Sequence, residues 1–254
     1  LPFALIFAII GLIYHFIRDP KRAFSILILF IITGISDRWL IKFYLGLDQV
    51  GLYGAGYKIG SAISIVVLAF NLSWQPYYLK HHKDERFISN INKISYAFFI
   101  LLIVLSTGLS VLWPFLIKIN INGYYLIGET FWTGGAVVPW VAFGYFFYGL
   151  FVLQSPSIYL CNKQKWSPLF WLVGALSNIL INIILIPQIG FLGAGISSLI
   201  SYLLMFLIIL YKNQAWLKNN FIDVPLVLLG FCGVGIVVLG HGLPYTKVAY
   251  CLFF

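Results

Sequence analysis

Residues 166–211 have the sequence WSPLFWLVGALSNILINIILIPQIGFLGAGISSLISYLLMFLIILY, a run of 46 residues without Asp, Glu, Lys or Arg. A helix needs about 20 apolar residues to cross a bilayer core that is about 30 Å thick. The run is therefore too long for one crossing. Pro187-Gln188-Ile189-Gly190 stands near its middle, and Pro and Gly at this place predict a break in the helix. The stretch predicts two transmembrane helices joined by a short turn.

The whole chain has the same apolar character. Of its 254 residues, 61% are hydrophobic and 9% are charged, against about 45–50% and about 25% in soluble proteins. No soluble fold has enough interior to bury so much apolar surface. Cys161, Cys232 and Cys251 lie far apart and give neither a disulfide framework nor the spacing of a metal site. We therefore predict an all-α, polytopic membrane protein.

Charge-free stretches predict about eight to nine spans with short loops, and no soluble domain. The predicted spans are residues 1–17, 23 to about 37, 59–79, 94–117, about 133–157, the two halves of 166–211, 224–240, and a truncated run after Lys247. The chain starts at Leu1 and stops inside an apolar run at Phe254. We interpret residues 1–254 as one transmembrane domain, and as a fragment cut at both ends.

The basic residues, which give a formal net charge of +9, are divided unequally between the two sets of alternating loops. One set holds eleven: Arg18, Lys21, Arg22, Lys80, Lys83, Arg86, Lys93, Lys163, Lys165, Lys212 and Lys218. The other set holds five: Arg38, Lys42, Lys58, Lys118 and Lys247. Lys and Arg collect in cytoplasmic loops, so the first set is predicted to be cytoplasmic. The positive charge then reflects topology, and no nucleic-acid partner is predicted.

An eight-residue motif occurs twice in similar form. Gln49-Val50-Gly51-Leu52-Tyr53-Gly54-Ala55-Gly56 returns as Gln188-Ile189-Gly190-Phe191-Leu192-Gly193-Ala194-Gly195. We expect both copies in outer loops, each opening a helix that runs back inward. The first Gly permits a bend, and Gly-Ala-Gly lets helices approach closely. Transporters are often built from repeated halves, although Gly-rich turns also resemble one another by chance.

Two groups of motifs resemble a known transporter family. The first group is Asp37-Arg38, Leu45-Gly46, Val50-Gly51-Leu52-Tyr53 and an apolar helix closing on Pro76. The second is Asn178, Asn182, Ile186-Pro187, Gly190 and Gly193-Ala194, preceded by Lys163 in a basic loop. Their order resembles the C-terminal half of the polysaccharide (O-antigen-type) flippases, in the multidrug/oligosaccharidyl-lipid/polysaccharide exporter superfamily. The resemblance covers residues 23–211, with 212–254 as extra C-terminal helices; a Pro usual in the family is missing after Arg22.

The resemblance implies a two-lobed fold with twelve to fourteen helices around a central cavity. This chain would be the second lobe, and its first partner would be the missing N-terminal lobe. The implied substrate is a polyprenyl-pyrophosphate-linked saccharide, carried across the inner (cytoplasmic) membrane of the cell. Polysaccharide-assembly proteins are further implied partners. No cofactor and no enzymatic activity are expected.

Asp37 and Arg38 form the sharpest single feature. A helix that begins near Ala23 rises 1.5 Å per residue, so Asp37 lies about 21 Å along it. Charges inside a bilayer are costly and normally face a cavity or a partner. Arg38 and Lys42 are four residues apart and share a helix face; the resemblance implies that they hold the lipid phosphates. Asp37 either neutralises Arg38 or takes part in ion coupling.

A plainer interpretation of the two cations stays open. Arg38 and Lys42 could extend their charged ends to the membrane surface, beside an interfacial aromatic belt that consists of Trp39, Phe43 and Tyr44. In that case both side chains anchor the helix and bind no substrate.

Polar side chains form two stripes on other predicted spans. Ser64, Asn71 and Gln75 repeat at helical spacing, and Asn178 and Asn182 form a second pair. Such amides could line a path for sugars, or could form hydrogen bonds between helices worth about 0.6–2 kcal/mol each. The candidate substrate-binding residues are Asp37, Arg38, Lys42, Asn71, Gln75, Asn178 and Asn182.

Two other motifs give no site. His81-His82-Lys83-Asp84-Glu85 contains potential metal ligands, but it has no partner cluster and is interpreted as a solvated loop. Gly51 and Gly56 have the spacing of a Walker motif, yet Tyr57 stands where that motif requires Lys. Energy for transport must then come from a gradient, from substrate flow or from another protein.

The sequence therefore favours a transporter that flips a lipid-linked oligosaccharide from the cytoplasmic to the outer leaflet for surface polysaccharide biosynthesis. The nearest alternative is a drug or cation antiporter of the same superfamily, which usually needs several buried carboxylates. A membrane glycan polymerase or acyltransferase is a third interpretation, with His241 as the best candidate base but no acid near it. A truncated lobe that transports nothing is the fourth.

Overall fold

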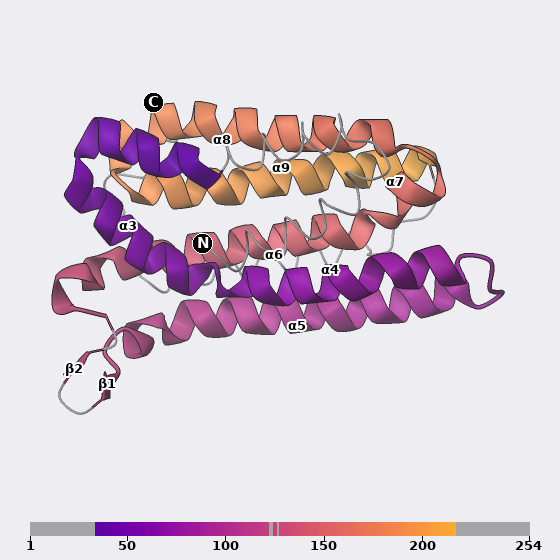
Figure 1. Cartoon of the computed structure of the whole chain (residues 1–254), viewed down its shortest axis with the longest axis horizontal. Helices are drawn as coiled ribbons and strands as arrows, with labels where there is room; N and C mark the ends of the chain where they lie inside the picture. Colours follow the sequence, from indigo (N-terminus) through magenta and orange to yellow (C-terminus); the bar gives the residue numbers. More distant parts are fainter. Residues whose placement is uncertain (1–33, 122–123, 126, 217–254) are drawn as a thin grey trace.

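The computed structural model describes residues 34–121, 124–125 and 127–216 (Figure 1). Helix 34–45 is followed by α3 (Leu47–Gly60), α4 (Ala62–His81), α5 (Phe87–Leu116), β1 (Asn120–Ile121), β2 (Tyr124–Tyr125), η1 (Glu129–Val137), α6 (Val138–Gln154), α7 (Pro156–Leu160), η2 (Gln164–Trp166), α8 (Ser167–Ile189) and α9 (Leu192–Trp216). The two short strands pair antiparallel. Everything else that is regular in the described residues is helical, which confirms the all-α class.

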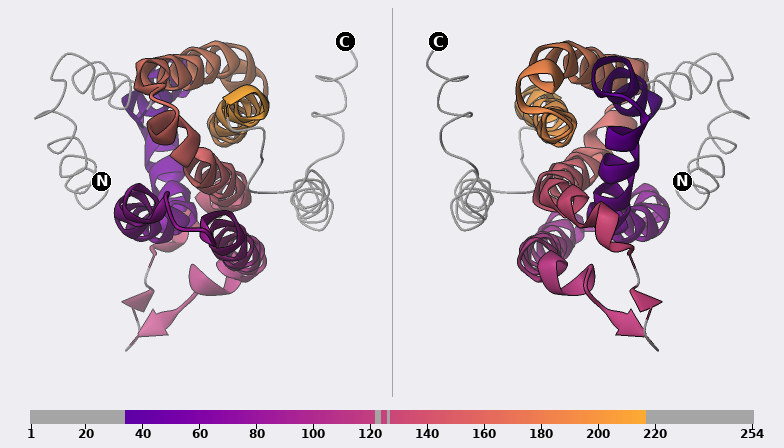
Figure 2. Two further views of the ribbon diagram at one scale, coloured as in Figure 1. Left: turned by 90° about the vertical axis from the view of Figure 1, so that its right-hand side faces the viewer. Right: turned by 90° about the vertical axis from the view of Figure 1, so that its left-hand side faces the viewer.

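Helix α6 is the centre of the bundle. It is apolar on all sides, as expected of a helix surrounded by others, and it packs against α3, α4, α5 and α9. Figure 2 shows it in the middle of the cross-section. At Gly149 the packing is especially tight, because an added Cβ would overlap the side chain of Leu102 on α5 and lie 3.1 Å from Val67 on α4. A small residue thus lets three helices meet.

Several helices have the length and composition of membrane spans. Four segments of the described residues qualify, namely Phe87–Leu116, Glu129–Leu160, Gln164–Ile189 and Leu192–Trp216. Helices α3 and α4 qualify together as a fifth, bent by 45°. These segments match five predicted spans and identify a membrane protein. The other predicted spans, at 1–17, 224–240, after Lys247 and most of 23–37, lie outside the described residues.

The break predicted within residues 166–211 is confirmed. Helix α8 ends at Ile189, and α9 begins at Leu192. Between them, Gly190 has φ +72°, a backbone conformation that residues with a Cβ rarely adopt. Pro187 lies inside the last turn of α8, so the chain changes direction at Gly190 and not at Pro187.

The location predicted for the first copy of the repeated motif is wrong. Residues 49–56 lie inside α3 and not in a loop, and Gly51 makes no bend. The chain reverses earlier, at Gly46, which has φ +89° and separates helix 34–45 from α3. Glycine is tolerated within a helix that tertiary contacts hold in place, so a Gly-rich motif does not fix where the chain turns.

The two copies share a close approach to the same part of the bundle. An added Cβ on Gly56 would overlap the carbonyl oxygen of Gly134 and lie 2.7 Å from Val137, and one on Gly195 would lie 2.5 Å from Val137. Gly193 is equally tight against α8. Gly54, by contrast, has no atom within 4 Å of an added Cβ. The predicted close packing therefore holds for three of these glycines and is wrong for Gly54.

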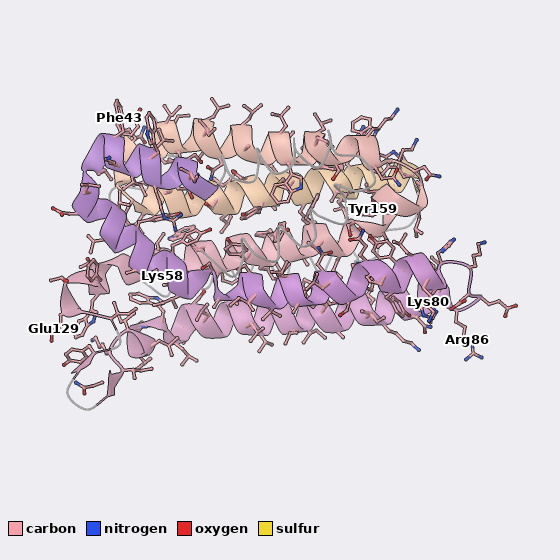
Figure 3. All side chains as sticks on the ribbon, in the orientation of Figure 1. Phe43, Lys58, Lys80, Arg86, Glu129 and Tyr159 are labelled. Carbon is pink, nitrogen blue, oxygen red and sulfur yellow. The ribbon has the colours of Figure 1, made fainter. Side chains whose placement is uncertain are left out.

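The connections between helices gather at two opposite ends of the bundle. Lys80, in the last turn of α4, and Arg86, just before α5, lie at the same end as Tyr159 of α7 (Figure 3). Phe43 and Glu129 lie at the other end. This grouping agrees with the predicted division of the loops into two sets, except that Lys58, predicted in a loop, lies within α3. The assignment of the first end to the cytoplasm rests on the positive-inside rule.

Candidate functional site

Asp37 lies inside the bundle although its side chain is ionisable. Helix 34–45 turns one face inward, on which Asp37 is 4% exposed, Leu40 8% and Ile41 0%. A spacing of three and four residues places these side chains on one side of a helix. Leu40 and Ile41 share an apolar cluster with Tyr53 of α3 and Val141 of α6. Their burial therefore carries Asp37 into the interior.

Three hydrogen bonds reach the Asp37 carboxylate, each from a different helix. The amide nitrogen of Asn182, on α8, donates to Oδ1 over 2.7 Å. The hydroxyl of Tyr53, on α3, donates to Oδ2 over 2.8 Å, and that of Ser198, on α9, donates to Oδ2 over 3.2 Å. One carboxylate thus connects four helices, and all three donors are electrically neutral.

Further amide and hydroxyl groups of α8 and α9 surround these donors. Asn178 and Asn182 are both fully buried, and Nδ2 of Asn182 also donates to Oδ1 of Asn178 over 3.1 Å. Ser197 donates to Oδ1 of Asn182 over 2.5 Å, and Ser36 donates to Oδ1 of Asn178 over 3.0 Å. We use the name Asp37 cluster for Asp37, Tyr53, Asn178, Asn182, Ser197 and Ser198.

Arg38 and its neighbour Asp37 form no direct ion pair in the described residues. Its Nη1 donates to the carbonyl oxygen of Gly34 over 2.9 Å, and its guanidinium carbon lies 5.0 Å from the centre of the Tyr57 ring. Within the described part of the chain, no ion pair involves Asp37. A buried carboxylate is costly unless it is protonated, hydrogen-bonded or paired with a cation. Neither role considered for Asp37 is tested by this geometry, which shows only that the two side chains form no direct pair in the described residues.

The cluster offers side-chain oxygens and only one acidic group. Hard cations prefer oxygen ligands, and Asp37, Asn178, Asn182 and Ser197 each bring at least one. Among the residues that the structure describes, no three His, Cys, Asp or Glu side chains come together as a metal site would require. A single charge on Asp37 fits a proton or a monovalent ion better than a divalent metal.

The remaining candidate residues lie outside the Asp37 cluster. Arg38 is half-buried and Lys42 is exposed. Their neighbours Trp39 and Phe43 are 63% and 69% exposed and stack with ring centres 5.9 Å apart, so the interfacial anchor stays open as an interpretation. Asn71 and Gln75 are half-buried on α4. The two predicted amide stripes are therefore separate, and only the one on α8 joins Asp37.

The His-rich turn after α4 holds a local pair. Nδ1 of His81 lies 2.7 Å from Oδ2 of Asp84, and the side chains are 38% and 57% exposed. An exposed pair of this kind contributes little to stability. The turn is the solvated loop that the sequence predicts.

Three members of the Asp37 cluster are not among the residues selected from the sequence. Tyr53 falls within the first copy of the repeated motif, and Ser197 and Ser198 follow the second copy after one intervening residue, Ile196. Their proximity to Asp37 is tertiary, because α3 and α9 meet it from different directions. The sequence gives one signal for these residues: each copy of the repeated motif contains or is closely followed by hydroxyl side chains.

No known protein family, no curated protein and no solved structure matches this chain. Its class therefore follows from the fold and the site alone. The described residues form a helical bundle with the composition of a membrane protein, in which a carboxylate-centred polar cluster is buried between four helices. The resemblance to polysaccharide flippases rests on the sequence motifs and stays a prediction.

Proposed function

We propose that the protein is a transporter that flips a lipid-linked oligosaccharide from the cytoplasmic to the outer leaflet of the inner membrane, for surface polysaccharide biosynthesis. The headgroup of such a lipid is polar and cannot cross about 30 Å of hydrocarbon unaided. In this proposal the described bundle is one lobe of a two-lobed transporter. The substrate is a polyprenyl-pyrophosphate-linked saccharide, and rocking of the lobes opens the cavity to each side in turn.

The Asp37 cluster is the observation that carries the proposal. Ionisable side chains within membrane helices mark ion and substrate pathways. Asp37 is hydrogen-bonded to α3, α8 and α9 at the same time. Binding or release of a proton or cation at this carboxylate would change all three contacts together. A transporter needs such an element, whose preferred arrangement depends on an ion.

Arg38 and Lys42 supply the positive charge for the substrate phosphates. Arg38 follows Asp37 in the chain, yet its guanidinium lies over the Tyr57 ring. It forms no ion pair with any described residue. The planar guanidinium can bind two phosphate oxygens at once. The Tyr57 ring, 5.0 Å away, favours the cation on its face.

Export of surface polysaccharide by Arg38 variants tests this role. Arg38→Ala in the full-length protein is expected to abolish export while membrane insertion stays intact. Arg38→Lys is expected to recover only part, because Lys keeps the charge and loses the two-pronged geometry. Lys58→Ala, which removes an exposed cation of α3, is the matched control and should export normally. If transport per molecule is unchanged in Arg38→Ala, Arg38 binds no phosphate and serves only as an interfacial anchor.

A drug or cation antiporter of the same superfamily is the second candidate. The buried carboxylate of Asp37, which has no cationic side chain as a partner in the described residues, favours it, because such a group can exchange a proton for an organic cation. Efflux of a fluorescent organic cation from cells decides between the two. The antiporter predicts dye efflux that Asp37→Asn removes, and the flippase predicts none. The polymerase or acyltransferase interpretation depends on His241, which lies outside the described residues.

A further inference from the structure

Helix α6 reaches the surface of the described bundle at only three positions. All of Val138–Gln154 is buried except Trp140, Tyr145 and Tyr148. Tyr145 and Tyr148 are three residues apart and therefore neighbours on one face of the helix. The central helix thus presents tyrosine rings where its neighbours leave it uncovered.

These two rings belong to a continuous row. Ring centres are 6.4 Å apart between Tyr57 and Tyr145, 5.6 Å between Tyr145 and Tyr202, 5.3 Å between Tyr202 and Tyr148, and 6.0 Å between Tyr148 and Trp171. We call these five residues the tyrosine row. They come from α3, α6, α8 and α9, and each is half-buried. Arg38 lies over the Tyr57 ring at one end of the row.

The depth of the row does not fit contact with lipid. Tyr and Trp side chains that face lipid concentrate at the membrane surfaces. Tyr145 lies at the middle of the span Glu129–Leu160, and Tyr202 lies near the middle of Leu192–Trp216. At comparable depths the exposed side chains of α5 and α8 are aliphatic, as lipid requires: Ile100, Leu101, Val104, Leu176, Leu180 and Ile184.

One hydroxyl group of the row, that of Tyr148, is available to a polar occupant. The hydroxyl groups of Tyr57 and Tyr145 lie 2.7 Å apart and bond to each other. That of Tyr148 forms no hydrogen bond with any residue that the structure describes. A hydroxyl that faces hydrocarbon without a partner is costly. A ligand with both apolar and hydroxyl-bearing faces would satisfy the ring and the hydroxyl together.

We propose that the tyrosine row is the surface along which the saccharide part of the substrate passes, an inference that rests on the proposed function. The C–H face of a pyranose ring packs against an aromatic face, and its hydroxyl groups pair with tyrosine hydroxyls. Arg38, at the Tyr57 end, holds the phosphates to which the saccharide is joined. The row and the cation thus match the two parts of one headgroup.

Binding of two probes to the purified full-length protein tests the inference. One probe is a polyprenyl diphosphate that carries N-acetylglucosamine, and the other is the same diphosphate without sugar. Tyr148→Ala is expected to weaken binding of the sugar-bearing probe about three- to tenfold and to leave the sugar-free probe unchanged. Tyr148→Phe should weaken it less, because the ring remains. Arg38→Ala should weaken both probes. Tyr211→Ala is the control, since Tyr211 is 69% exposed on α9 and outside the row.

The outcomes separate the two proposals. If wild-type protein binds neither probe, the proposed function fails and the saccharide surface fails with it. If both probes bind and Tyr148→Ala changes neither, or both equally, the saccharide surface alone is overturned.

Tyr148→Leu replaces the Ala variant if that protein does not fold. A Tyr148→Cys thiol should react with a small methanethiosulfonate reagent and be protected by the sugar-bearing probe. A thiol that stays unreactive without probe would show that another segment covers the row, and would overturn the inference.

Discussion

At the scale of single residues, the proposed ion coupling depends on Asp37. Its carboxylate accepts hydrogen bonds from Asn182, Tyr53 and Ser198 and has no cationic partner in the described residues. Hydrogen bonds alone could hold helices together without any charge. The carboxyl group adds a site whose charge can change, and that is the property that a coupled transporter uses.

Asp37→Asn tests this distinction. The amide keeps the shape of the side chain but cannot change its charge. We expect normal insertion, a modest loss of stability of about 1–3 kcal/mol from a mismatched donor, and no turnover in a transport assay. Asp48→Asn, an exposed carboxylate in the first turn of α3, is the control. Full turnover in Asp37→Asn would show that the cluster is structural.

The glycines of the first repeated motif allow a matched pair of substitutions on one helix. Ala in place of Gly within a helix normally stabilises by about 1 kcal/mol. At Gly54 there is free space, so Gly54→Ala should melt at the same or a higher temperature. At Gly56 the new methyl group would meet the carbonyl oxygen of Gly134, so Gly56→Ala should cost about 1–3 kcal/mol. Thermal unfolding in detergent measures both, and equal melting temperatures would contradict the packing.

Part of the site could be predicted from these residues and part could not. Asp37, Asn178 and Asn182 are recognisable because polar side chains are conspicuous in apolar helices. Tyr53, Ser197 and Ser198 are not, since hydroxyl residues are common in membrane helices and only the fold brings these to Asp37. The same holds for Tyr145 and Tyr202, whose rings come from different helices.

At the scale of helices, the long apolar helices can be located from the sequence, whereas the short, more polar helix α3 cannot. Spans 94–117 and 166–211 are free of charge and stand out by hydropathy alone. Helix α3 contains Asp48, Lys58 and several glycines, which resemble a loop. Contacts of α3 with η1 and α6 hold it helical, and such contacts override local propensity.

The turns at Gly46 and Gly190 give a prediction at this scale. Both have positive φ, at +89° and +72°. Ala at either position would be strained by about 1–3 kcal/mol and should lower the melting temperature. Gly108→Ala, within α5 and with no atom within 4 Å of the new Cβ, should leave it unchanged or raise it. Equal behaviour of the three variants would mean that these turns lie elsewhere.

At the scale of the whole molecule, the arrangement of the helix ends predicts which residues face the same side. Single cysteines at Ser89 and Gln164, in a chain without its native cysteines, should be labelled only from the cytoplasm. Cysteines at Thr130, at the start of η1, and at Gln188, at the end of α8, should be labelled only from outside, because these helix ends lie on the side with fewer basic residues. A membrane-impermeant maleimide, added to intact cells and to inverted vesicles, provides the measurement. Labelling of both pairs from one side would contradict the span count.

Leaflet translocation in proteoliposomes tests the central claim most directly. Full-length protein is reconstituted with a fluorescent polyprenyl diphosphate that carries N-acetylglucosamine, and a membrane-impermeant quencher follows its appearance in the opposite leaflet. The account predicts translocation that needs the protein, responds to an imposed proton or sodium gradient, and is lost in both Asp37→Asn and Arg38→Ala. Translocation no faster than in vesicles without protein, or equally fast in both variants and the wild type, would contradict it.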